Sequence, residues 1–262
     1  MDIVAKRVSR QKNGIVCKNC HTASKGNYCY HCGQAITTRR LEVKQLLSET
    51  FFSVVNVNQG QGFIFTLKSL CTKPGEVIRE YIQGRRIVYY PPHKYLLLIG
   101  AVAAFFSTRY HFFSGQPASG ILDEEADSLL AGFWLYADTY TTLINIVTIP
   151  VFALFSWLFR RKAYNYAENI VLNTYITSQQ LLLFICMVPV FVFYSTAPGY
   201  VYLIDCYIVA TMLYNVWVYK QFFGFRRWTG VLCAGLIMLS AYVCQFLLNL
   251  LFFIVAKNLV SL

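Results

Sequence analysis

Four cysteines near the amino terminus have the spacing of a metal-binding site. They form two CxxC pairs, Cys17 with Cys20 and Cys29 with Cys32, with eight residues between the pairs. Two CxxC pairs on tight turns can present four thiolates as a tetrahedron about 2.3 Å from one metal ion. Four thiolates close the coordination shell, so the pattern predicts one structural Zn²⁺. A reduced or disulfide-bonded tetrad is the alternative, and a cytosolic location argues against disulfides.

The residues around the cysteines favour a minimal zinc ribbon over residues 17–34. Gly33 follows the second pair, where a small residue lets backbone amides approach the sulfurs. His21 occupies the matching place after the first pair and is a departure from this pattern. The short gap between the pairs leaves room only for a small ribbon. His21 and His31 are predicted to be surface residues and not ligands.

Motifs of enzymes are missing from the sequence. It contains no Gly-rich phosphate loop, no GxSxG, no HExxH and no paired-carboxylate motif. His93 and His111 are isolated from other residues that could act with them in catalysis. The sequence therefore favours a non-enzymatic protein.

The composition after the ribbon is that of a membrane protein. Hydrophobic residues make up 56% of the chain and charged residues 13%, about half the charged share of soluble domains. A transmembrane helix needs about 20 apolar residues, and the long uncharged runs meet that length. The predicted fold class is an all-α polytopic membrane protein with about five transmembrane helices. These helices are expected at residues 95–113, 139–159, 172–194, 200–219 and 231–255.

The basic residues are distributed asymmetrically about the predicted spans. The net charge is +11. Of the 23 Lys and Arg residues, 21 fall on the same side of the predicted spans as the amino terminus, and only Arg109 and Lys257 fall on the opposite side. The positive-inside rule then places the amino terminus in the cytoplasm and the carboxyl terminus in the periplasm. The basic excess is explained by topology and by contact with anionic lipid. The lipid bilayer is thus the expected partner, and nucleic acid is disfavoured.

Four segments follow from these patterns: a flexible basic tail at 1–16, the ribbon at 17–34, a cytosolic amphipathic helical region at 35–94 and the transmembrane domain at 95–262. In the third segment, Pro74 begins a predicted helix and Gly84 ends it. Its apolar stripe consists of Val77, Ile78, Tyr81 and Ile82. We expect such helices to lie on the inner leaflet. The alternative is a small soluble bundle that covers its own stripes.

Two charged residues fall inside the predicted spans. Arg109 and Asp205 both reach the outer third of the bilayer at 1.5 Å rise per residue. Charge in hydrocarbon costs a few kcal/mol, so we expect the two side chains to face the bundle interior and interact, directly or through water. The alternative is that Arg109 snorkels to the outer headgroups. Pro150 and Pro189 are expected to kink their spans.

The uncharged polar residues of the spans are expected to hydrogen-bond between helices. They are Asn145, Gln179, Gln180, Asn215, Gln245 and Asn249.

The segments "YCYHCGQ" and "TLKSLCTKPGEVIREYIQGRRIVYYPPHKYL" resemble an uncharacterised membrane-protein family, found mainly in Bacteroidetes. Its members join an amino-terminal zinc ribbon to a multi-span domain of unknown function. The resemblance is specific over residues 17–97. Farther on, "YAEN" at 166–169 departs from it, because the family usually has His where this chain has Asn169; chemistry at Glu168 is therefore in doubt. The resemblance implies the bacterial inner membrane and a cytosolic ribbon, and it implies no activity.

The preferred interpretation is a non-enzymatic protein of the bacterial inner (cytoplasmic) membrane. Its ribbon and amphipathic helices would dock a protein partner, or the chain's own spans, at the inner surface. One alternative is a transporter or channel for a small solute or ion, with Arg109 and Asp205 along its path. A second alternative is a membrane-embedded enzyme that acts on lipid, which would need a cluster of His or Asp near one leaflet. The sequence does not specify the substrate, the partner or the oligomeric state.

Overall fold

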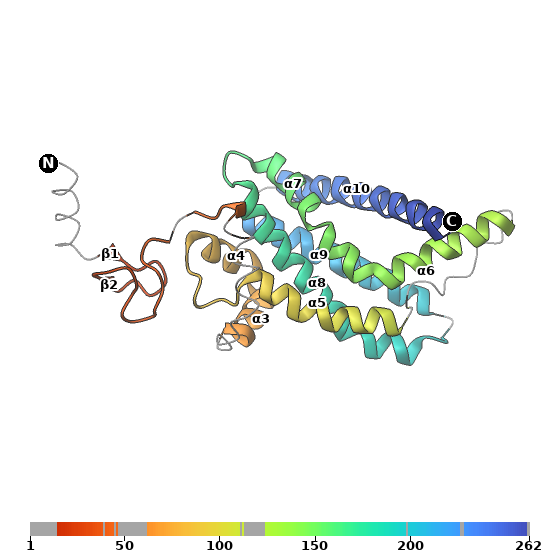
Figure 1. Cartoon of the computed structure of the whole chain (residues 1–262), viewed down its shortest axis with the longest axis horizontal. Helices are drawn as coiled ribbons and strands as arrows, with labels where there is room; N and C mark the ends of the chain where they lie inside the picture. Colours follow the sequence, from red (N-terminus) through yellow and green to blue (C-terminus); the bar gives the residue numbers. More distant parts are fainter. Residues whose placement is uncertain are drawn as a thin grey trace. The chain divides into compact units, whose positions relative to one another are not determined.

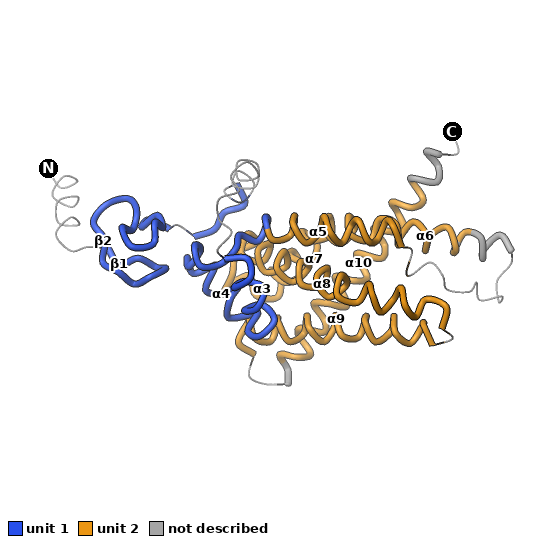
Figure 2. Tube along the Cα trace, turned by 90° about the horizontal axis from the view of Figure 1, so that it is seen from below, with its two compact units in different colours: residues 1–94 blue, residues 95–262 orange. Residues whose placement is uncertain are grey.

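The computed structural model describes residues 15–38, 40–44, 46, 62–110, 112, 124–197, 199–225 and 228–260. The chain divides into two compact units, Met1–Lys94 and Tyr95–Leu262 (Figure 2). Residues 1–14 of the predicted tail (1–16) and residues 47–61 of the predicted amphipathic region (35–94) lie outside the described residues.

The first unit begins with the ribbon. Strands β1 (Ile15–Val16) and β2 (Ala23–Ser24) pair antiparallel, with Ile15 opposite Ser24. Ile15 and Val16 were assigned to the tail from the sequence, but their pairing makes them part of the ribbon.

Over residues 62–91 the first unit forms two helices, α3 (Phe63–Thr72) and α4 (Pro74–Gln83). Both predicted limits of α4 are confirmed. Pro74 stands in the first turn, where the missing N–H costs nothing, and Gly84 ends the helix at φ 112°, a left-handed conformation that glycine adopts without a Cβ clash.

The apolar stripe of α4 is covered by protein. Val77, Ile78 and Tyr81 are each at most 3% exposed, and Ile82 is 8% exposed. The stripe therefore does not meet lipid directly, and for α4 the structure favours the alternative in which protein covers the stripe.

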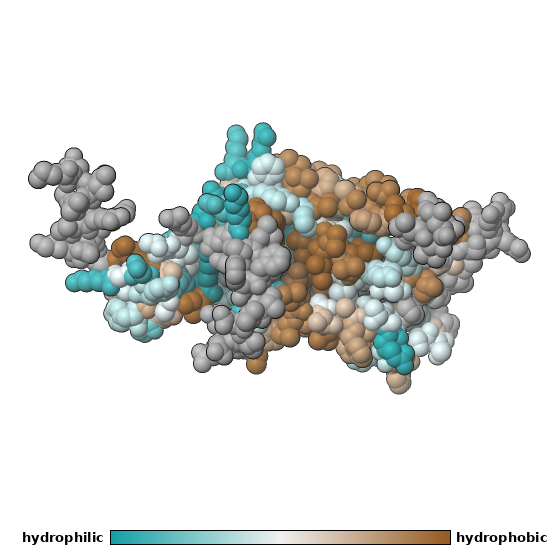
Figure 3. Space-filling model, in the orientation of Figure 1, coloured by the Kyte–Doolittle hydropathy of each residue, from teal (hydrophilic) through white to brown (hydrophobic). Residues whose placement is uncertain are grey.

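The described residues of the second unit form six helices, which Figure 1 labels: α5 (Pro92–Arg109, starting at the end of the first unit), α6 (Glu124–Val147), α7 (Ile149–Arg160), α8 (Tyr166–Tyr194), α9 (Tyr200–Phe223) and α10 (Trp228–Val260). Helix α8 packs on α6, α7 and α9, and α10 packs on α6, α7 and α9. Hydrophobic side chains cover much of the outer surface of these helices (Figure 3), such as Leu213, Leu232 and Leu239. Such an all-round apolar helix bundle suits a hydrocarbon environment.

Three described helices are long and apolar enough to cross a membrane: Tyr166–Tyr194, Tyr200–Phe223 and Gly230–Val255. They match the last three predicted spans. The predicted span at 139–159 is instead a pair of helices, Ala131–Val147 and Ile149–Arg160, bent by 46°, which makes up to four spans if the pair is one. The predicted first span, 95–113, corresponds to α5, which is 18 residues long and is not among these candidates because polar residues at its ends dilute its hydropathy.

The bend between α6 and α7 occurs at Thr148, as the kink predicted at Pro150 requires. Pro150 lies in the first turn of α7 and has no N–H with which to continue the hydrogen-bonded ladder of α6. By contrast, α8 continues through Pro189 to Tyr194.

Glu168 has a structural role at the start of α8. The backbone N–H of Glu168 donates to Asn165 Oδ1 at 2.8 Å, and the Asn165 N–H donates to Glu168 Oε2 at 2.8 Å. This reciprocal pair is a capping box, which satisfies two backbone N–H groups at a helix start. The carboxylate that the sequence left without a role thus stabilises the beginning of α8.

Candidate metal centre

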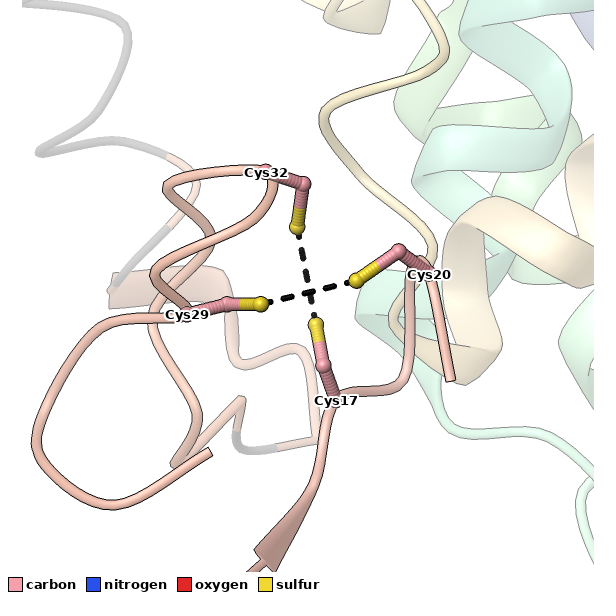
Figure 4. Close-up of side chains that lie close together, drawn as sticks. All are labelled: Cys17, Cys20, Cys29 and Cys32. Carbon is pink, nitrogen blue, oxygen red and sulfur yellow. Dashed lines mark hydrogen bonds between the residues drawn. The ribbon is translucent and has the colours of Figure 1, made fainter. Parts of the chain in front are cut away.

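The four cysteine sulfurs converge on one point (Figure 4). The Sγ atoms of Cys17, Cys20, Cys29 and Cys32 all lie within 4.8 Å of one another. Cys17 and Cys32 are 3.6 Å apart, and Cys20 and Cys29 are 3.5 Å apart. A tetrahedral site with metal–sulfur bonds of about 2.3 Å has sulfur–sulfur edges of roughly 3.8 Å, whereas a disulfide needs about 2.05 Å. All four cysteines are free thiols, and their arrangement fits one four-coordinate metal ion.

The two CxxC turns have the same backbone geometry. In the first turn, the His21 N–H donates to Cys17 O and the Cys17 N–H donates to Thr22 O, both at 3.0 Å. The second turn repeats both bonds at 2.8 Å, one from the Gly33 N–H to Cys29 O and one from the Cys29 N–H to Gln34 O. This pattern holds the first cysteine of each pair between two backbone bonds. The ligand positions are therefore set by the turns.

His21 adopts the conformation that its glycine counterpart adopts. Its φ is 58° and that of Gly33 is 74°, and His21 is the one non-glycine residue with positive φ in the described chain. Histidine tolerates this left-handed region better than most residues. Both His21 and His31 are exposed and lie outside the sulfur cluster, as predicted.

The sulfurs differ in protonation chemistry. Hydrogen bonding to the Thr22 hydroxyl, and then to its backbone, lowers the pKa of the Cys20 thiol to about 5, because it favours the thiolate. Burial raises the pKa of the Cys32 thiol to about 11. A bound divalent cation would deprotonate all four thiols, since its charge stabilises each thiolate. Such an ion would connect the two CxxC turns, whose shared hydrophobic core consists of Cys17, Cys29 and Ile36 among the described buried residues.

Gln34, directly after the second turn, joins the ribbon to the end of α4. Its Nε2 donates to Gly84 O at 2.6 Å and to Thr38 Oγ1 at 3.2 Å, and its Oε1 accepts the Arg86 N–H at 3.2 Å. The Gln34 side chain is buried at 5% exposure. Gln34 and Gly84 both lie in the two segments that carry the family resemblance, but nothing in their spacing predicts that they touch.

The segment after α4 is fixed by its own polar contacts. Glu80 Oε2 accepts hydrogen bonds from Arg85 Nη1 at 2.7 Å and from the Tyr89 hydroxyl at 2.6 Å. The Tyr90 N–H donates to Thr66 Oγ1 on α3 at 2.7 Å. Burial, and then the bond to Glu80, raise the pKa of Tyr89. The surface that receives Gln34 is thus held in place by both α3 and α4.

The structure does not bring Arg109 and Asp205 together. Both side chains are exposed, no ion pair joins these two described residues, and the Arg109 guanidinium lies 5.3 Å from the centre of the Tyr110 ring. Their similar depth is supported, because the Tyr200 hydroxyl of α9 donates to Phe112 O, just after α5, at 3.0 Å. The prediction that both side chains face the bundle interior is wrong, because each points outward from its helix. The apolar helices carry no stripe from which the sequence could fix the buried face.

Five of the six uncharged polar residues hydrogen-bond between helices as predicted, whereas no such bond of Asn249 is seen among the described residues. Gln180 Nε2 of α8 donates to Asn215 Oδ1 of α9 at 3.0 Å, and Gln245 Nε2 of α10 donates to Asn145 Oδ1 of α6 at 3.1 Å. Gln179 Nε2 donates to the Tyr95 hydroxyl at 2.8 Å.

Sequence reasoning missed other members of this polar interior. The Tyr219 hydroxyl donates to Asn173 Oδ1 at 2.6 Å, and Asn173 Nδ2 donates to Ser156 Oγ at 3.1 Å. Asp138 is buried at 1% exposure. The predicted span began one residue after Asp138, so its burial inside the helical unit was not foreseen.

Comparison with known proteins identifies one related segment. The model of a family described as "Protein of unknown function (DUF3667)" matches residues 61–104, which hold α3, α4 and most of α5. No curated protein and no solved structure matches the chain. The match, the four-cysteine cluster and the apolar helices are consistent with the resemblance to an uncharacterised membrane-protein family. The matched segment includes Gly84 and Arg86, the two residues that receive Gln34.

Proposed function

We propose that this chain is a non-enzymatic integral protein of the bacterial inner membrane in which a zinc ribbon serves assembly at the cytosolic surface. The observation that supports this best is the bridge from Gln34 to Gly84 and Arg86. Zinc lets a stretch of 18 residues, 17–34, fold where it could bury little core of its own. Buried hydrogen bonds then attach the folded ribbon to the α3–α4 layer. The ribbon is a docked part of the protein and carries no open metal position for catalysis.

A protein partner can bind the ribbon on its free surface. Tyr28 is 69% exposed and Tyr30 is 77% exposed, and both belong to the ribbon that holds the metal. Exposed tyrosines are common anchors in protein interfaces because they combine apolar area with a hydroxyl. Loss of zinc would disorder these side chains and so weaken partner binding.

The bilayer is the other partner. On α3, Ile64 is 77% exposed and Phe65 is 49% exposed, with Lys68 exposed farther along the helix. An exposed apolar pair beside a basic residue suits an interfacial helix on an anionic leaflet. This supports a position of the first unit at the cytosolic face.

We place five spans in the membrane, with the bent α6–α7 pair as one and α5 as the first. Helix α5 is bonded within the bundle at both ends, from Tyr95 to Gln179 and between the Ser107 and Thr142 hydroxyls at 3.3 Å. The basic asymmetry supports a cytoplasmic amino terminus and a periplasmic carboxyl terminus. A cytosol-dependent reporter should be active when fused after Lys162 and silent after Leu262. The reverse pattern would overturn this topology.

Hydrogen–deuterium exchange on the full chain in detergent tests the docking role. Removing zinc with a chelator should raise exchange in the ribbon and also in residues 80–90, because the ribbon would no longer hold Gly84 and Arg86. Residues 166–194 of α8 are the internal reference and should not change. Unchanged exchange at 80–90 after complete zinc removal would mean that the ribbon is an independent module, and the assembly role would fail.

A further inference from the structure

A polar cavity of about 170 Å³ lies inside the second unit. Side chains from five helices, α6 to α10, line it. The described lining contains no charged residue, and its amide side chains are Asn145, Asn173, Gln180, Asn215 and Gln245. At about 30 Å³ per molecule in liquid water, the space matches about five or six waters. The amide side chains of this lining contrast with the hydrophobic side chains on the outer surface of the same helices.

One wall of the cavity is held rigid by hydrogen bonds. Tyr242 of α10 lies between the two amides that join α8 and α9. Its hydroxyl accepts from Asn215 Nδ2 at 3.1 Å and lies 3.4 Å from Gln180 Nε2. The Tyr242 ring also packs edge-on against Phe152 of α7, with centroids 5.1 Å apart. The donors and acceptors of this wall therefore point in fixed directions.

Gln245, three residues after Tyr242 on α10, has an unused acceptor. The residue is 9% exposed, and its Nε2 donates to Asn145. Its Oε1 is buried and accepts no hydrogen bond from any residue that the structure describes. A buried amide oxygen without a donor costs a few kcal/mol, and in a membrane interior no bulk water relieves that cost. A donor inside the cavity would satisfy it.

The break between α6 and α7 opens onto the same cavity. Thr148 at the break and Phe152 one turn later are lining residues, and the two helices are bent there by 46°. Interrupted helices at membrane depth are tolerated where they line a cavity, and in transport proteins they mark solute sites.

A second cavity of about 230 Å³ adjoins the first. Both are lined by Asn145, Gln180, Tyr207 and Ile208, and the buried Asp138 lines only the second. The carboxylate is thus kept out of the amide-lined chamber. That separation argues against a cation as the ligand of the first cavity.

We propose that the amide-lined cavity is a binding site for a small uncharged solute with both hydrogen-bond donors and acceptors, such as a short polyol or a simple amide. The solute donates to Gln245 Oε1 and exchanges hydrogen bonds with the Asn215 and Tyr242 wall. This site is independent of the zinc ribbon and of its docking role. It gives the transporter alternative a specific location within the helices, and neither Arg109 nor Asp205 is among the described lining residues.

Thermal unfolding of the full chain in detergent tests this site. The probes are acetamide, glycerol and erythritol, with acetate and ethylammonium as charged probes of similar size, each titrated to several hundred millimolar. A ligand that binds only the folded state stabilises it by RT ln(1 + [L]/Kd), so the unfolding midpoint rises along a curve that becomes logarithmic in ligand concentration above Kd. At least one neutral probe should raise the midpoint by a few degrees along such a curve, and the charged probes should not.

Two variants on one helix make the comparison specific. Gln245→Met removes the amide at nearly constant volume and should abolish the probe-dependent rise in the midpoint. Asn249→Leu, one turn away on α10 and outside the cavity lining, should leave it intact. If Gln245→Met does not fold, Thr211→Val on the α9 wall replaces it with the same expected loss.

Three results would overturn the proposal. One is a wild-type midpoint that no neutral probe raises along the curve expected for binding, which would leave only ordered water in the cavity. Another is an equal shift in wild type and Gln245→Met, which would assign the effect to the bulk solvent. The third is a binding curve for a charged probe alone.

Discussion

Replacing Gln34 with Ala should loosen the ribbon from α4 while the ribbon keeps its metal. The substitution removes the donor to Gly84 O and the acceptor of the Arg86 N–H. The four cysteines and the backbone bonds of both turns remain. Each net hydrogen bond contributes about 0.5–1.5 kcal/mol, and buried partners left unpaired add to the loss. Two bonds therefore stabilise the docked state by about 1–3 kcal/mol, which corresponds to roughly a 5- to 150-fold larger population of the undocked ribbon.

The amide of Arg86 is the direct reporter, because it is the group that Gln34 protects. Hydrogen exchange at Arg86 should accelerate by the same factor in Gln34→Ala, provided that opening of the contact limits exchange. Zinc content should stay at the wild-type level. Gln34→Glu should be at least as disruptive, since it keeps the acceptor for Arg86 but places a carboxylate oxygen against Gly84 O.

Gln83→Ala is the matched control. Gln83 is exposed and precedes Gly84 directly, so this variant changes the same residue type at the end of α4 without touching the bridge. Exchange at Arg86 that stays within a factor of two of wild type in Gln34→Ala, with Gln83→Ala equal to it, would refute the reasoning. Loss of zinc from Gln34→Ala would refute the separation of docking from metal binding.

Purified protein should hold about one zinc per chain. Cys29→Ser should lose the zinc, whereas Cys71→Ser should keep it because Cys71 is an exposed cysteine outside the cluster. Full metal content in the Cys29 variant would exclude the site. His21→Gly should relieve the left-handed strain at φ 58° and stabilise the metal-bound ribbon by up to about 1 kcal/mol, seen as up to about fivefold tighter zinc in competition with a chelator; weaker zinc would contradict this. Arg109→Ala and Asp205→Ala should change the thermal stability additively, since the two side chains do not touch, and a double variant no worse than either single one would restore the pair.

The sequence predicts features whose determinants are local. The metal cluster follows from cysteine spacing, because two CxxC turns bring their thiols together without help from distant residues. The limits of α4 follow from Pro74 and Gly84, and the α6–α7 break follows from Pro150. Each of these residues changes the allowed backbone at its own position.

Contacts between distant positions could not be predicted in the same way. Gln34 and Gly84 are 50 residues apart, and no periodicity links a ribbon turn to a helix end. The spans are apolar on all sides, so the rise per residue gave the depth of Arg109 and Asp205 but not the direction of their side chains. For the same reason Asn173 and Tyr219 were not distinguished from the neighbours that surround them.

The end of α4 also sets a limit on the length of that helix. The acceptor at Gly84 is a backbone carbonyl, so its direction depends on where the helical ladder stops and not on any side chain. Inserting or deleting one residue within α4 would turn that carbonyl by about 100° and move it by about 1.5 Å, out of reach of Gln34. Substitution at position 84 is strained as well, because its φ of 112° is a backbone conformation that side chains with a Cβ rarely adopt. We therefore expect α4 to tolerate new side chains on its exposed face but no change in the number of residues between Pro74 and Gly84.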